Sequence, residues 1–249
     1  PTWLYVSDRL IQFPMGIFAI AIGTVLLPTL SNLNSVNDKG KFILNIKKGQ
    51  RFVLFIGLPS LIGLFFCAED LISTIFYRGE FTELDVIKSS YSLMAFSIGL
   101  PFFMLMKVLT PAFFARKNTK TPMYVALISL LLNASLNYLL AFVLGYGHIG
   151  LAIGSSIAAL VSVIILEIIL YKDGFIQIRG LFNKFNFIIL LSSIFLIVFL
   201  NFYTTKTNFF EFNQIERIIY LSIEISVSIF IYFFIARFLN GKPLRTLFN

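Results

Sequence analysis

The chain of 249 residues is 58% hydrophobic and only 13% charged, whereas about a quarter of the residues of a typical soluble domain are charged. This composition excludes a water-soluble globular protein and indicates an integral membrane protein. The net charge of +8 does not indicate a nucleic-acid partner, because the basic residues collect in short loops between apolar runs. One cysteine and one histidine supply neither an internal disulfide nor a metal site, and we predict no cofactor.

Seven apolar segments are predicted to cross the bilayer as helices, because each approaches or exceeds the roughly 20 residues that a span requires. The predicted fold class is therefore all-α, a polytopic transmembrane helix bundle. A basic loop is expected at 32–50, and an acidic amphipathic stretch at 68–85 is predicted to form a short interfacial helix. In chain order, the predicted spans are 3–31, 50–67, 86–115, 122–144, 149–171, 185–203 and 215–239.

Prolines recur within the first three predicted spans, at Pro14, Pro28, Pro59 and Pro101. Neighbouring helices or water satisfy the carbonyl groups that such prolines free, so the clustering favours helices that bend, as transporter helices do. The alternative is that proline is simply commoner in membrane helices than in soluble ones.

The numbers of lysine and arginine residues alternate from one loop to the next. Four segments, 39–51, 116–120, 172–184 and 237–245, together hold fourteen of them. The opposite loops hold four, namely Arg78, Lys88, Lys206 and Arg217. Because cytoplasmic loops are enriched in basic residues, we predict that the N-terminus lies outside and the C-terminus lies in the cytoplasm.

Asp8 and Arg9 are the most prominent polar residues within the spans. A central charge of this kind costs about 2.5–3.5 kcal/mol on insertion scales, so it normally faces a partner or a wet cavity. Neighbouring side chains on a helix point about 100° apart, so we expect each of the two to find a partner outside its own helix. The guanidinium of Arg9 matches phosphate oxygens. The alternatives are a structural ion pair and an arginine at the outer interface.

Three further polar side chains are candidate substrate ligands. Lys107 is predicted to lie about 13 Å inside the cytoplasmic boundary, where it either faces a cavity or snorkels to the surface. Asn133 and Asn137 share one face of their span at an i, i+4 spacing. Such residues more often hold membrane helices together than bind a substrate, and this alternative stays open.

Several motifs resemble those of the MurJ/MviN lipid II flippases, which belong to the MATE-like exporter superfamily. They are SDRLIQFPMG at 7–16, GTVLLPTLS at 23–31, FYRGEFT at 76–82, GLP at 99–101, KVL at 107–109, PAFFAR at 111–116, TKTP at 119–122 and GHIGLA at 147–152. The matches run in one order from about residue 2 to residue 160. The last two spans agree with the family only in hydropathy and position.

This resemblance implies that the chain corresponds to helices eight to fourteen of a fourteen-helix fold. Residues 1–173 would form most of the second lobe. Residues 174–249 would add two helices that form a groove for a lipid tail, followed by a basic cytoplasmic tail. The N-terminal lobe of the same protein is the implied partner, and the initial Pro1 is consistent with a piece of a longer chain.

The resemblance also implies a function and a location. The family moves lipid II, an undecaprenyl-pyrophosphate-linked disaccharide-pentapeptide, from the inner to the outer leaflet of the bacterial plasma membrane by alternating access. This activity is transport rather than enzymatic catalysis, and the partners are lipid II and membrane lipids. Arg9 and Asp8 match the D-R-L motif of the family, whereas Gln12 stands where some members have glutamate.

Three alternatives remain open. A related MATE-like exporter of polysaccharide-repeat lipids or drugs would share the fold, but it would lack the paired motifs at 7–16 and 76–82. An enzyme acting on polyprenyl phosphates would need acidic metal ligands near a membrane face, and the acids of 68–85 lack the D-x-x-D spacing. A scaffold bundle would leave Arg9 unexplained.

Overall fold

The computed structural model describes residues 2–176, 184–204 and 209–240, without the side chains of residues 19–23. This part of the chain is helical and contains no strand, which confirms the all-α class. The predicted basic tail at 241–249 lies outside the described residues. The helices are α1 (Thr2–Ser35), α2 (Lys39–Phe66), α3 (Ala68–Phe76), α4 (Glu83–Ala115), α5 (Lys120–Asn137), η1 (Tyr138–Val143), α6 (Gly147–Lys172), α7 (Lys184–Thr204) and α8 (Gln214–Asn240).

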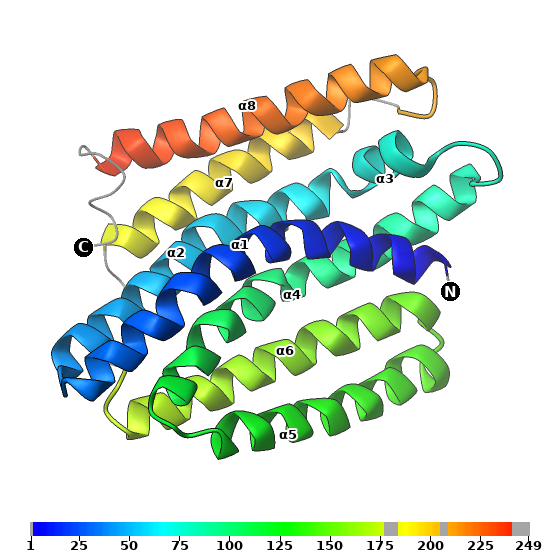
Figure 1. Cartoon of the computed structure of the whole chain (residues 1–249). Coiled ribbons are helices and arrows are strands. Elements are labelled where there is room, and N and C mark those ends of the chain that lie inside the picture. The colour runs from blue at the N-terminus through cyan, green and yellow to red at the C-terminus, as the bar shows by residue number, and fades with distance from the viewer. Residues whose placement is uncertain (1, 177–183, 205–208, 241–249) are drawn as a thin grey trace.

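The long helices lie side by side as a bundle, with α7 and α8 at one flank and α5 and α6 at the other (Figure 1). Six of the described segments are long and apolar enough to cross a bilayer: α2, α4, α5 with η1, α6, α7 and α8. The first predicted span forms α1, a continuous helix of 34 residues. A helix of that length extends about 51 Å, which exceeds the thickness of a hydrocarbon core. The arrangement agrees with the prediction of about seven spans.

The predicted loop at 32–50 is wrong, because α2 begins at Lys39. The side chain of Asp38 caps this helix by accepting a hydrogen bond from the Lys41 N–H at 3.0 Å. Phe42 and Ile46 repeat at the helical spacing and are buried in the core. The basic segment is therefore an amphipathic first part of α2, which leaves only a turn at 36–38 between α1 and α2.

The fourth predicted span changes its winding near its end. The α-helix α5 passes into the π-helical turn η1, where each turn holds an extra residue. Gly150 of α6 lies against this turn. A Cβ at Gly150 would come within 2.7 Å of the Leu140 carbonyl carbon, so only glycine permits this approach.

Buried apolar side chains form two main clusters. The larger joins α1, α2, α4, α5 and α6, and the smaller joins α2, α7 and α8. In the smaller cluster, the hydroxyl of Tyr232 on α8 donates to the Phe55 carbonyl of α2 at 2.8 Å. The helices α7 and α8 therefore pack on the flank formed by α2, with their own apolar core.

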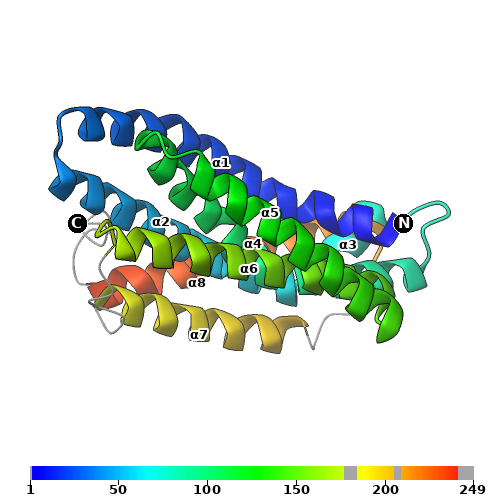
Figure 2. The same ribbon diagram turned by 90° about the horizontal axis from the view of Figure 1, so that it is seen from below.

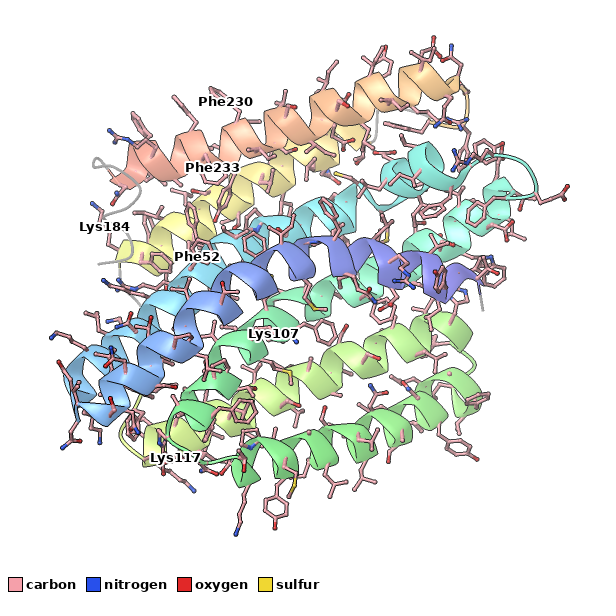
Figure 3. All side chains as sticks on the ribbon, viewed as in Figure 1. Phe52, Lys107, Lys117, Lys184, Phe230 and Phe233 are labelled. Carbon is pink, nitrogen blue, oxygen red and sulfur yellow. The ribbon has the colours of Figure 1, made fainter. Side chains whose placement is uncertain are left out.

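One end of the bundle carries most of the basic side chains, including the labelled Lys117 and Lys184 in Figure 3. Four residues form a cluster there that we call the basic-end clamp: Lys39, Arg116, Asp173 and Phe175. Arg116 forms an ion pair with Asp173 at 2.5 Å, and the guanidinium lies 4.1 Å from the centre of the Phe175 ring. The Lys39 ammonium lies 4.6 Å from the same ring centre. The clamp joins the start of α2 to the ends of α4 and α6, which share one end of the molecule in Figure 2.

Candidate functional site

A cavity of about 380 Å³ opens between α1, α4, α5 and α6. Its polar lining comes from Asp8 and Gln12 on α1, Ser129 and Asn133 on α5 and Ser155 on α6. The remaining lining is apolar and includes Phe103 and Met106 of α4. We call this hollow the polar cavity. The structure thus brings together three of the predicted site residues, Asp8, Gln12 and Asn133.

Asp8 finds its partner within its own helix. The Nε2 of Gln12 donates to the Oδ2 of Asp8 across one helical turn. The expectation that Asp8 needs a partner on another helix is therefore wrong, because the i, i+4 spacing already supplies an amide donor. This bond leaves both side chains at the wall of the polar cavity, where they can meet a polar ligand.

Arg9 also finds its contact within α1. Its guanidinium carbon lies 4.9 Å from the centre of the Tyr5 ring, one turn earlier, and the side chain is exposed. The expected partner on another helix is absent among the described residues, which also give Arg9 no ion pair. Arg9 does not line the polar cavity. At about 100° per residue it lies about 60° from Gln12 and about 40° from Phe13 around the helix, so it is exposed on the face of α1 between these two residues.

Asn133 and Asn137 form one hydrogen-bonded unit. The Nδ2 of Asn137 donates to Asn133 Oδ1 at 2.5 Å, and the Nδ2 of Asn133 donates to Ser155 Oγ at 3.3 Å. Asn133 lines the polar cavity, whereas Asn137 lies one turn behind it and packs against Gly154 of α6. Asn133 thus serves helix packing and also lines the cavity, while Asn137 positions the Asn133 side chain.

Lys107 is exposed and does not line the polar cavity. Figure 3 shows it on α4, in the part of the view between α1 and α6. Its chain neighbour Met106 does line the cavity. Lys107 therefore belongs to the surroundings of the cavity rather than to its wall.

A second hollow of about 500 Å³ adjoins α1, α2, α3, α7 and α8 and is almost entirely apolar. We call it the apolar groove. The helix α8 contributes Ile225, Ser228, Ile229, Tyr232 and Phe233, and α7 contributes Leu196. The groove expected between the last two predicted spans stays a prediction, because this hollow is lined mainly by α2 and α8.

The helix α1 separates the two hollows. Asp8, Gln12 and Met15 line the polar cavity, whereas Phe13, Pro14 and Phe18 line the apolar groove. One helix therefore presents polar groups to one hollow and apolar groups to another. This arrangement suits an amphipathic ligand whose polar and apolar parts lie on different sides of α1. The motif at 7–16 predicts the importance of this helix, but the groove walls from α2 depend on tertiary packing.

A family model described as Lipid II flippase MurJ matches residues 1–239. The chain belongs to this family. A probable lipid II flippase MurJ from Vibrio cholerae is 42% identical over 173 residues, which cover 70% of this chain and 33% of that relative. The corresponding protein of Buchnera aphidicola subsp. Schizaphis graminum is 31% identical over 249 residues, which cover 98% of this chain and 47% of that relative.

A solved structure of the lipid II flippase MurJ in an inward closed conformation has the same fold. Its TM-score is 0.77 at 29% identity, and the match covers 95% of this chain and 46% of that structure. The chain thus spans a third to a half of the length of these MurJ relatives. The MurJ membership and the apolar helices identify a multi-pass protein of the bacterial inner membrane.

Proposed function

We propose that this chain is the C-terminal part of a lipid II flippase. The complete protein moves undecaprenyl-pyrophosphate-linked disaccharide-pentapeptide from the inner to the outer leaflet by alternating access. The N-terminal lobe of the same protein supplies the other half of the pathway. The observation that carries this proposal is the pair of hollows on the two sides of α1, one polar and one apolar.

The two parts of lipid II have opposite solvation needs. Pyrophosphate and sugars lose strong interactions with water when they enter hydrocarbon, so the protein has to replace those interactions during transfer. The polar cavity offers Asp8, Gln12 and Asn133 for this purpose, since amides and carboxylates bond sugar hydroxyls and peptide groups. The polyprenyl tail is apolar and fits the apolar groove.

Arg9 is the proposed ligand of the pyrophosphate. Its guanidinium carries five N–H donors and a permanent charge, and it binds phosphate oxygens in pairs. The exposed position on α1 leaves these donors available, because the Tyr5 ring occupies only one face of the group. Lys107 adds a second positive charge near the polar cavity.

The proposed orientation places the basic-end clamp in the cytoplasm and the start of α1 outside. Lys39, Arg116 and the labelled Lys117 and Lys184 lie at one end of the bundle, which supports this orientation by the positive-inside rule. The cytoplasm-negative membrane potential then favours outward movement of an anionic head group.

The proposed division into units follows the apolar cores. Residues 1–173 form the main part of the C-terminal lobe, and residues 174–249 add the two last helices and the tail. The separate cluster of α2, α7 and α8 supports this division, because α7 and α8 share few buried side chains with the larger core. The tail lies outside the described residues.

The competing enzyme function has weaker support. An enzyme for polyprenyl phosphates would collect acidic metal ligands at a membrane face. Instead, Asp85 caps α4 through Thr82, and Asp70 is buried against α8. The MurJ match favours a lipid II flippase over a sister exporter of the same superfamily.

The test uses complementation of a bacterial strain depleted of its flippase by the full-length protein. Arg9→Ala is expected to abolish growth while the protein stays at its normal level in the membrane, because the pyrophosphate loses its guanidinium ligand. Arg237→Ala is the matched control, because Arg237 is also an exposed arginine but lines neither the polar cavity nor the apolar groove. Normal growth with Arg9→Ala would exclude Arg9 from the site.

A further inference from the structure

Two acidic side chains are buried where α3 meets α8. Glu224 of α8 is 0% exposed and Asp70 of α3 is 6% exposed. The two carboxyl groups are close enough to interact with each other, and the Cys67 thiol interacts with Glu224. Asp70 and Glu224 line neither the polar cavity nor the apolar groove, so the proposed transport site does not account for them.

If both side chains were ionised, neither could donate a hydrogen bond to the other. In the described part of the chain, both carboxyl oxygens of Glu224 and the Oδ2 of Asp70 are buried without a hydrogen-bond partner. Two buried negative charges in contact repel each other, and each also loses its hydration. Such an arrangement is stable only when a positive charge, from a basic side chain, a metal ion or a proton, lies between the two carboxyl groups.

Within 2–176, 184–204 and 209–240, no side chain around the pair supplies a positive charge. Glu69 on α3, Tyr203 on α7 and Cys67 at the end of α2 are the titratable groups that act on it among the described residues. Arg217 lies two turns earlier on α8, but its N–H groups bond to the carbonyls of Phe209, Phe210 and Tyr77. No group of three or more metal-ligating side chains is placed to hold a metal ion within the described ranges.

A single proton resolves the conflict. One protonated carboxyl donates its O–H to the other carboxylate, which turns a repulsive contact into a charge-assisted hydrogen bond. Burial, followed by the charge of Glu224, raises the pKa of Asp70 to about 8. The pair therefore keeps a proton at neutral pH, and its titration belongs to the pair rather than to one residue.

We propose that Asp70 and Glu224 form a proton-binding site, in which one shared proton fastens α8 to α3. Binding takes H⁺ from water and makes one O–H bond on one carboxyl group, with no other bond changed. Release returns the proton to water and leaves two carboxylates that repel each other across the α3–α8 contact.

The position of the pair gives the proton a structural effect. Cys67 and Leu71, which flank Asp70, and Ile225 and Ser228, which follow Glu224, all line the apolar groove. At the start of α8, the Nε2 of Gln214 bonds to the Thr74 carbonyl of α3 at 2.8 Å. Loss of the proton is therefore expected to separate α8 from α3 beside the groove. The Gln214 bond would still hold the first turn of α8 against α3. This inference does not depend on which lipid the protein carries.

Infrared spectroscopy of the full-length protein in lipid nanodiscs tests the site directly. The wild type is expected to show a protonated-carboxyl C=O band at neutral pH, and this band should disappear above about pH 9. Glu224→Gln and Asp70→Asn should each remove it. Glu216→Gln is the matched control and should leave the band unchanged, because Glu216 is an exposed acid of the same helix that accepts from the Asn213 N–H.

Thermal unfolding of the same samples gives an independent readout. A carboxyl whose pKa is raised in the folded state binds more protons when folded, so stability falls as pH rises between about 4 and 8. Glu224→Gln gives Asp70 a permanent amide donor and should reduce this slope, whereas Glu216→Gln should not. Absence of the band in the wild type at neutral pH would overturn the proposal, as would a band unaffected by both variants. A metal ion in place of the proton would give the first of these results.

Discussion

The indole N–H of Trp3 donates to the Oδ1 of Asp85 at 2.6 Å across 82 residues of chain. Asp85 also accepts from the backbone N–H and hydroxyl of Thr82, as part of the capping box of α4. The same carboxylate therefore completes the first turn of α4 and fixes the first turn of α1 against it. This contact orients the part of α1 that precedes Asp8.

Replacement of Trp3 by phenylalanine is expected to destabilise the protein by at least about 1 kcal/mol, because one hydrogen bond to a carboxylate is lost together with half of the indole ring. The measurement is thermal unfolding of the full-length protein in detergent. Tyr5→Phe is the control, since it removes an exposed hydroxyl from the same helix. Equal unfolding temperatures for the two variants would show that the Trp3–Asp85 bond adds no stability.

Gly150→Ala is expected to destabilise the protein by about 1–3 kcal/mol, the usual cost of inserting a methyl group into a packed contact. The new Cβ would lie 2.7 Å from the Leu140 carbonyl carbon and 2.8 Å from the Ala141 nitrogen, and backbone atoms of η1 cannot rotate away. Gly63→Ala is the control, because its Cβ would meet nothing within 4 Å. Denaturant or thermal unfolding should show a lower stability for Gly150→Ala than for Gly63→Ala. Equal stability of the two variants would contradict the observed packing of α6 on η1.

Arg217→Lys is expected to destabilise the protein by about 1–3 kcal/mol despite keeping the charge. The buried guanidinium bonds to three carbonyls and lies 4.5 Å from the centre of the Tyr77 ring. A lysine ammonium cannot reproduce this planar set of donors. Arg237→Lys on the exposed side of α8 should leave the unfolding temperature unchanged. Identical behaviour of both variants would mean that Arg217 contributes charge alone.

The cap of α2 predicts a pH effect. The Lys41 N–H, and then the Lys41 ammonium, lower the pKa of Asp38 below its ordinary value of 3.8. Its stabilising contribution is therefore complete above pH 3.8 and is lost as pH falls through the lowered pKa. Asp38→Asn keeps an acceptor for the Lys41 N–H and should show a smaller loss of unfolding temperature in acid than the wild type. Asp38→Ala should be less stable than both at neutral pH, and equal acid sensitivity in all three would disprove the role of the carboxylate.

Hydropathy predicts the long helices well, because the bilayer imposes a length and an apolar composition that are visible in the chain itself. The start of α2 is the exception. Lysines at 39–48 indicate a loop by charge, yet Phe42 and Ile46 bury one face of this segment in the core. A window that averages hydropathy misses this amphipathic face, which the spacing of the two apolar residues does contain.

The polar sites depend more strongly on tertiary packing. The i, i+4 spacing of Asp8 and Gln12 is enough to predict their bond, and the expected external partner of Asp8 was unnecessary. In contrast, no local pattern connects Asp70 with Glu224. Their contact exists because α8 returns across the bundle to lie on α3.

The basic-end clamp has a mechanical consequence for the polar cavity. Arg116 and Lys39 share Phe175, so the ends of α2, α4 and α6 are pinned at one point. The cavity lies farther along the bundle, between the middle parts of α4, α5 and α6 and the first half of α1. Because these helices are joined at one end, a small rotation of a helix about the clamp produces a larger displacement farther along that helix, at the level of the cavity. The width of the polar cavity is then set from the basic-end clamp.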